Sequence, residues 1–160
     1  MNAPTTRPTV LTVLCILTFL SSISGLWTQS ERLWNPGVVA DQTKEIFEGL
    51  REKLEEQPSQ TDTKVVDRLF ESVIKQTTPQ TIKSSAVIML IFESLTLYAA
   101  YLMWNLRKLG FYLYLGGIAV AFFGSIFVIA GWLGIVTAIA SIFFSSVMCI
   151  IYAFNLKYLE

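Results

Sequence analysis

The sequence predicts an all-α integral membrane protein, a four-helix bundle with an extracytoplasmic two-helix amphipathic insert between the first and second spans. Apolar residues make up 53% of the chain and charged residues only 15%, so its core is not that of a soluble domain. Four apolar stretches of about 20 residues can each cross ~30 Å of hydrocarbon as a helix. Within one membrane domain covering residues 1–160, we place the spans at about 9–28, 84–104, 111–131 and 135–154, and the insert at 29–82.

The first span contains no charged residue, and Arg7 precedes it while Trp27 lies near its end. A basic residue, an apolar run and small residues at 21–25 are also features of a cleaved secretion signal. We expect the segment to be retained as a helix. Cleavage is the alternative, and it would leave three spans.

The insert is polar, since residues 29–82 hold ten of the twelve acidic residues and seven of the twelve basic ones. Two apolar stripes recur in it at helical spacing, with a turn expected at Pro58-Ser59-Gln60, caps at Thr61-Asp62-Thr63 and a stop at Pro79. The first stripe comprises Val39, Ile46, Phe47, Leu50 and Leu54; the second comprises Val65, Val66, Leu69, Phe70, Val73 and Ile74. The two helices either pack as a hairpin or lie flat on the membrane surface.

The last three spans follow one another with little chain between them. The second ends in an aromatic cluster that includes Trp104 and is followed by Arg107 and Lys108. Only residues 132–134 remain to turn the chain between the third and fourth spans, which predicts an antiparallel pair.

The basic residues beside the spans predict the orientation, because such residues stay in the cytoplasm. With four spans, Arg7, the Arg107-Lys108 pair and Lys157 all fall on one side. We therefore expect both termini in the cytoplasm and residues 29–82 outside it.

Two short segments resemble small bacterial four-span membrane proteins: RPTVLTVLCILTF at residues 7–19 and LRKLGFYLY at residues 106–114. That group has no assigned activity. The resemblance implies a bacterial origin, hence the cytoplasmic (inner) membrane, and nothing about chemistry.

Glu93 is the one ionisable residue deep inside a predicted span. A charged carboxylate at that depth costs at least a few kcal/mol, so Glu93 is either neutral or faces partners inside the bundle. One interpretation is a proton or cation site at Glu93, with nearby oxygens supplied by Ser94, Thr96, Thr137 and Ser141. The other is a neutral Glu93 that only forms a hydrogen bond with a neighbouring helix.

Small residues in the last two spans predict where helices pack closely. On the third span they are Gly117, Ala121, Gly124 and Gly131; on the fourth they are Gly134, Ala138, Ser141 and Ser145. We expect these two faces to pack in the last hairpin, although they could instead contact another copy or another protein.

The composition argues against several functions. Histidine is absent, Cys15 and Cys149 lie within apolar segments, and the net charge is zero, so we expect no enzyme, metal, cofactor or nucleic-acid partner. The leading hypothesis is a non-enzymatic accessory or assembly subunit that contacts the lipid bilayer and other membrane proteins or further copies of itself. The alternative is a small oligomeric proton or cation conductor that uses Glu93.

Overall fold

The structure, a computed structural model, describes residues 8–55, 63–129 and 132–160. These residues form six α-helices, one short 3-10 helix and no strand. The elements are α1 (Thr9–Trp34), α2 (Pro36–Glu55), α3 (Thr63–Gln76), α4 (Pro79–Trp104), α5 (Lys108–Val128), α6 (Trp132–Phe154) and η1 (Leu156–Tyr158). Arg7, the turn expected at Pro58-Ser59-Gln60, the caps Thr61 and Asp62, and Gly131 lie outside the described residues.

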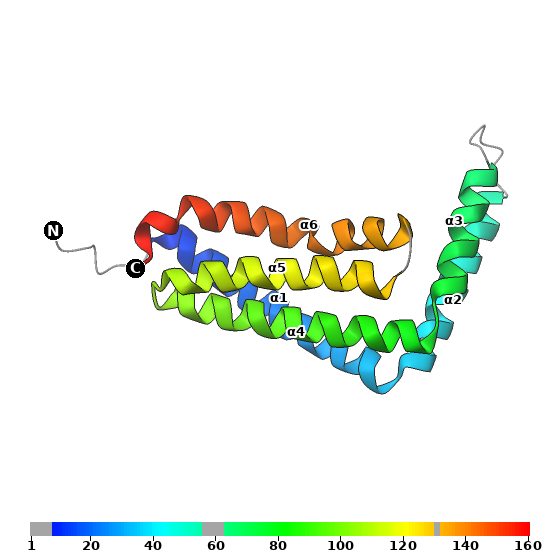
Figure 1. Cartoon of the computed structure of the whole chain (residues 1–160), viewed down its shortest axis with the longest axis horizontal. Helices are drawn as coiled ribbons and strands as arrows, with labels where there is room; N and C mark the ends of the chain where they lie inside the picture. Colours follow the sequence, from blue (N-terminus) through cyan, green and yellow to red (C-terminus); the bar gives the residue numbers. More distant parts are fainter. Residues whose placement is uncertain (1–7, 56–62, 130–131) are drawn as a thin grey trace.

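Four of these helices are long and apolar enough to cross a membrane: α1, α4, α5 and residues 134–154 of α6. The prediction of an all-helical fold with four helices able to span a membrane is confirmed for the described residues. Figure 1 shows the four helices side by side, with the start of α1 and the C-terminal residues at the same end of the bundle.

Two helices, α1 and α4, extend well beyond the apolar stretches from which their spans were predicted. α1 continues to Trp34, and α4 already begins at Pro79. The hydroxyl of Thr78 accepts a hydrogen bond from the Thr81 amide at 3.1 Å and caps α4. Polar residues thus continue both helices, because a helix needs backbone hydrogen bonds rather than apolar side chains.

α6 begins earlier than expected, since residues 132–134 are already helical. Gly134 permits a close approach between the start of α6 and the end of α5. A Cβ on Gly134 would overlap the backbone carbonyl of Ile129, so only glycine lets the two chain segments approach so closely.

The four long helices pack as a row of neighbours rather than a closed ring. α4 lies between α1 and α5, and α6 packs against α5, whereas α1 and α6 barely touch. A seam between α1 and α6 is therefore the least packed part of the bundle.

The end of the bundle that carries both termini is closely packed. Leu11, Cys15, Met103 and Tyr152 are fully buried there, within an apolar cluster to which α1, α4, α5 and α6 all contribute. At this end Lys108 donates its amide proton to the Glu160 carbonyl at 2.7 Å. The C-terminal segment is thus fixed to the start of α5.

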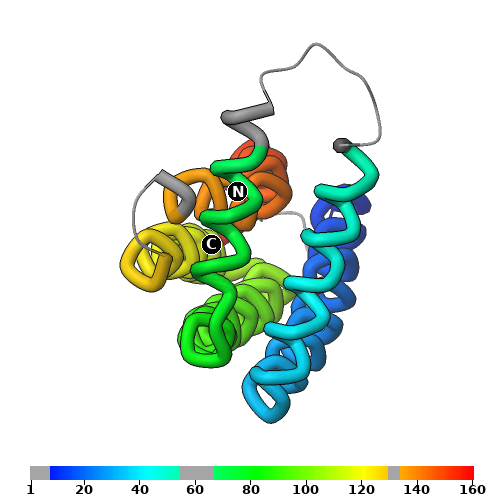
Figure 2. Tube along the Cα trace, turned by 90° about the vertical axis from the view of Figure 1, so that its right-hand side faces the viewer, coloured from blue at the N-terminus to red at the C-terminus, as the bar shows by residue number. Residues whose placement is uncertain are grey.

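α2 and α3 form a hairpin, one of the two arrangements that the sequence allowed. The Phe47 and Phe70 rings meet edge to face at 6.0 Å, and the Arg51 Nε lies 3.4 Å from Asp67 Oδ1. The hairpin stands across the opposite end of the bundle from the termini (Figure 1), and Figure 2 shows α3 crossing in front of the bundle. It therefore covers part of that end.

Candidate functional site

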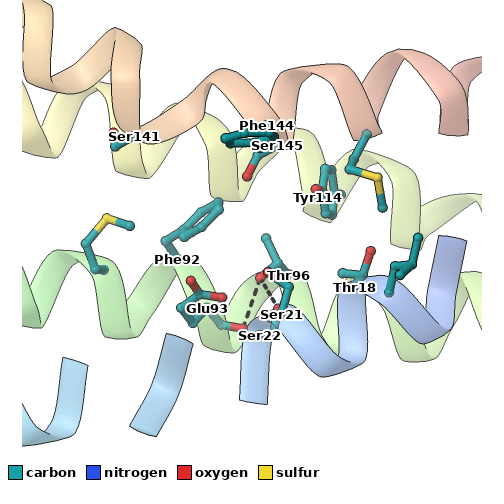
Figure 3. Close-up of a pocket in the computed structure, with 13 residues that line it drawn as sticks. Thr18, Ser21, Ser22, Phe92, Glu93, Thr96, Tyr114, Ser141, Phe144 and Ser145 are labelled. Atoms are coloured by element: carbon teal, nitrogen blue, oxygen red, sulfur yellow. Dashed lines mark hydrogen bonds between the residues drawn. The ribbon is translucent and has the colours of Figure 1, made fainter. Parts of the chain in front are cut away.

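A cavity of about 420 Å³ lies between α1, α4, α5 and α6 (Figure 3), and it is partly open to the outside, since Leu17 and Phe144 in its lining are 50% and 80% exposed. Eight of its lining side chains carry oxygen: Thr18, Ser21, Ser22, Glu93, Thr96, Tyr114, Ser141 and Ser145. The remainder are apolar: Leu17, Met89, Phe92, Phe144 and Met148. This cavity is the candidate site, because polar groups inside a transmembrane bundle are costly and mark binding sites or ion pathways.

Glu93 is the only carboxylate among the residues that line the cavity, and it is only 9% exposed. Ser22 of α1 and Thr96 of α4 line the cavity beside it, with their hydroxyl oxygens 2.8 Å apart. The Thr96 hydroxyl also donates to the backbone carbonyl of Glu93 at 3.1 Å. The carboxyl group therefore faces the cavity, beside hydroxyls of two helices.

Gly25 makes room for this carboxyl group. A Cβ at residue 25 would overlap the carboxyl atoms of Glu93, so the end of the Glu93 side chain can lie against α1 here only because residue 25 has no side chain. Gly25 therefore positions Glu93.

Two tyrosines close the cavity toward the end that carries the termini. Tyr114 is 3% exposed, and its ring meets that of Tyr152 edge to face at 5.4 Å. The Tyr152 hydroxyl forms a 2.8 Å hydrogen bond with the Thr18 hydroxyl. Leu11, Cys15 and Met103 fill the space beyond them, so no polar path continues in that direction.

The structure brings together three of the five residues predicted for the ion site: Glu93, Thr96 and Ser141. The expectation for Ser94 is corrected: it is exposed on the outer face of α4, and its hydroxyl donates to the Leu90 carbonyl at 2.7 Å. Ser94 lies about 100° around the helix from Glu93, on the side away from the cavity, which follows from 3.6 residues per turn. Thr137 lies in a second cavity, described below.

The glycine face of α5 packs against a different helix from the one expected. Gly117 lies against Thr96, and Gly124 lies against Ile88, both residues of α4. Ala121 is fully buried on the same helix. The expected pairing with the small residues of α6 is thus corrected, because α4 fills the groove that the glycines create.

On α6 the small residues have separate roles. Ala138 is fully buried, whereas Ser141 and Ser145 line the cavity that contains Glu93. Gly134 lies where the start of α6 closely approaches the end of α5. Small size permits close packing, but on this helix it also makes room for the cavity.

The sequence patterns did not indicate Ser22, Gly25 or Tyr114 as site residues. A signal for two of them exists in α1, where small or polar residues recur at Thr18, Ser22, Gly25 and Gln29. Spacings of four, three and four place them on one helical face. No comparable pattern identifies Tyr114, since tyrosines near span ends are usually interfacial.

Among the described residues, no group of three or more His, Cys, Asp or Glu side chains could hold a metal ion. One carboxyl group with several hydroxyls can hold a proton, a small cation or water. No protein-family model, curated protein or solved structure matches the chain. Its function therefore has to be inferred from the geometry of this cavity.

Proposed function

We propose that this protein conducts a proton or a small cation, with Glu93 as the site that accepts it. The supporting observation is that Glu93, in the middle of a helix long enough to span a membrane, is buried and faces a cavity with several hydroxyls in its lining rather than the outer surface of the bundle. This is the alternative function expected from the sequence. The four helices of one chain form the cavity, so a single copy supplies the whole site.

The surroundings of Glu93 suit a group that gains and loses charge. A bare carboxylate is unstable in hydrocarbon, but hydroxyls and water can solvate either protonation state. Ser22 and Thr96 place two hydroxyl oxygens beside Glu93 that can accept from its protonated form, and water in the cavity can donate to its charged form. A carboxyl group that served only to join two helices would need no cavity beside it.

Tyr114 and Tyr152 close one end of the cavity. This supports a site that exchanges its proton or cation with one side of the membrane at a time. In this arrangement Thr18, Tyr114 and Tyr152 separate the cavity from the end that carries the termini. Passage across the membrane then requires the hydrogen bond between Thr18 and Tyr152 to open. Protein ensembles commonly contain such minor open states.

We also propose an orientation of the chain in the membrane. The basic residues at Arg107, Lys108 and Lys157 support cytoplasmic termini and an extracytoplasmic insert at 29–82, in the inner membrane of a bacterium. Under this topology the Glu93 cavity is closed toward the cytoplasm.

Flux into liposomes tests the proposal. The purified protein is reconstituted with a pH-sensitive dye inside, and a potassium diffusion potential drives proton entry. We expect the parent protein to conduct, Glu93→Asp to retain part of the flux, and Glu93→Gln to fall to the level of empty liposomes. Glu71→Gln is the matched control, because Glu71 is exposed on α3 and lies outside the cavity.

Two results would reject conduction through Glu93. One is a parent protein that conducts neither protons nor monovalent cations. The other is a Glu93→Gln variant that folds normally and conducts as well as the parent.

A second candidate function is the accessory or assembly role, supported by an exposed stripe on α2. Ile46 is 69% exposed, Leu50 48% and Leu54 41%, although the three lie at spacings of four on one helical face. A second copy or a partner membrane protein could cover this stripe. We expect native mass measurements in mild detergent to show a complex that Ile46→Ser with Leu50→Ser disrupts; a strictly monomeric parent would contradict this role.

A further inference from the structure

A second cavity, of about 440 Å³, lies beneath the α2–α3 hairpin. Phe47, Val73, Gln76 and Thr77 form its hairpin side, and residues of α1, α4, α5 and α6 form the remainder. Met89 and Ser141 line both this cavity and the one that contains Glu93. The two cavities are therefore neighbours along the bundle and share a wall.

Gln29 of α1 lines the second cavity and is only 8% exposed. Its side-chain oxygen Oε1 is a buried acceptor that has no hydrogen-bond partner among the described residues. A buried amide oxygen left unpaired is unfavourable, and proteins ordinarily satisfy such an atom with an ordered water. The cavity therefore requires a hydrogen-bond donor.

Three hydroxyls that line the same cavity already donate their protons within the chain. Thr77 donates to the Val73 carbonyl at 2.7 Å. Ser125 and Ser141 donate to the carbonyls of their own helices at 2.7 Å and 2.9 Å. These oxygens retain only lone pairs, so they too can accept hydrogen bonds from a small donor.

The positive charge of Arg32 limits which hydrogen-bond donors can bind in the cavity. It lies one turn along α1 from Gln29, lines the same cavity and is exposed to solvent. Its positive charge disfavours a bound cation at this position, whereas water carries no charge and supplies two donors. Water is the occupant that satisfies both the acceptors and the charge.

We propose that the second cavity is a water-filled vestibule that hydrates Glu93 from the hairpin end of the bundle. Gln29 is its buried acceptor, and Met89 and Ser141 lie where it meets the Glu93 cavity. The vestibule gives Glu93 a route along which to exchange protons, and it sets the side of the bundle from which they come. The biological purpose of the vestibule rests on the proposed function.

Cysteine accessibility tests the vestibule without measuring transport. In a background of Cys15→Ala and Cys149→Ala, single cysteines replace Ser141 at the junction and its neighbour Ala140, which is exposed on the outer face of α6. The probe is a charged, membrane-impermeant methanethiosulfonate reagent applied to sealed vesicles of one orientation. Glu48→Cys on the hairpin and Lys157→Cys near the C-terminus mark the two sides.

We expect Ser141→Cys to react from the side that modifies Glu48→Cys, at least about 10-fold faster than Ala140→Cys, because a thiol ionises readily only where water reaches it. Adding Gln29→Leu should slow the reaction of Ser141→Cys, since it removes the buried acceptor. Equal rates for Ser141→Cys and Ala140→Cys in normally folded variants would overturn the proposal. So would reaction of Ser141→Cys only from the side that modifies Lys157→Cys.

The test also separates the vestibule from conduction. Repeating the labelling with Glu93→Gln should leave the rate at Ser141→Cys unchanged, because the vestibule does not depend on the carboxyl charge. Labelling that persists without any flux refutes conduction alone. Flux that depends on Glu93 without labelling refutes the vestibule alone.

Discussion

The carboxyl group of Glu93 lies against the backbone of α1 at Gly25, in the space that a side chain at residue 25 would occupy. Glycine at this position has a specific consequence: it lets the carboxyl group fit between α1 and α4 while it faces the cavity. The pair joins two spans that are far apart in the sequence.

Gly25→Ala should impair conduction more than stability. The added Cβ displaces the end of the Glu93 side chain, which is flexible, and alanine is the better helix former, so the free energy of unfolding should change by only about 1 kcal/mol. Proton flux in liposomes should fall clearly. Gly116→Ala is the control, because a Cβ there meets nothing within 4 Å; equal flux in both variants would contradict the role of Gly25.

Gly110→Ala should destabilise the bundle although Gly117→Ala does not. A Cβ at residue 110 would lie 2.5 Å from the Ala99 carbonyl oxygen and 2.8 Å from the Met103 amide nitrogen, which are backbone atoms. Overpacking of this kind costs about 1–3 kcal/mol. At residue 117 the nearest atom is 3.4 Å away, an ordinary contact.

Unfolding of both glycine variants in mixed detergent micelles measures this difference. We expect Gly117→Ala to match the parent within about 1 kcal/mol, with any gain due to helix propensity. Equal losses at the two positions would show that the α4–α5 interface is not packed as described.

Tyr152→Phe should weaken the closure on the terminal side of the Glu93 cavity. It removes the hydroxyl that bonds to Thr18 at 2.8 Å, which should lower the free energy of unfolding by about 0.5–1.5 kcal/mol. If this closure limits conduction, flux should also rise. Tyr112→Phe is the control, since Tyr112 is 62% exposed; a Tyr152→Phe variant that behaves like it would argue against a closing role.

Phe70→Ala should loosen the α2–α3 hairpin far more than Asp67→Asn. Phe70 is 8% exposed and packs on Phe47, and truncating such a ring costs about 3–5 kcal/mol. The ion pair of Arg51 and Asp67 joins side chains 43% and 44% exposed, so its loss should cost about 0–1 kcal/mol. Amide hydrogen exchange across α2 and α3 measures both effects, and similar exchange in the two variants would contradict the ring packing.

Much of the secondary structure could be predicted because a membrane imposes strict rules. A span must satisfy its own backbone hydrogen bonds, so an apolar run of about 20 residues predicts a helix that can cross. The same reasoning identified Glu93 as unusual, since a charge within such a run is rare. Helical spacing likewise predicted α2 and α3 from the stripes that include Phe47 and Phe70.

The sequence by itself determined the number of helices able to cross a membrane, the polar insert between the first two, and the single carboxyl group within a span. Only the tertiary structure decided which helix faces meet: Glu93 faces a cavity while Ser94 faces outward, and the glycines of α5 pack on α4 rather than on α6. The physical reason is that lipid and a neighbouring helix are both apolar. Hydrophobicity therefore marks a span but not its inner face, which depends on how side chains of different helices fit together.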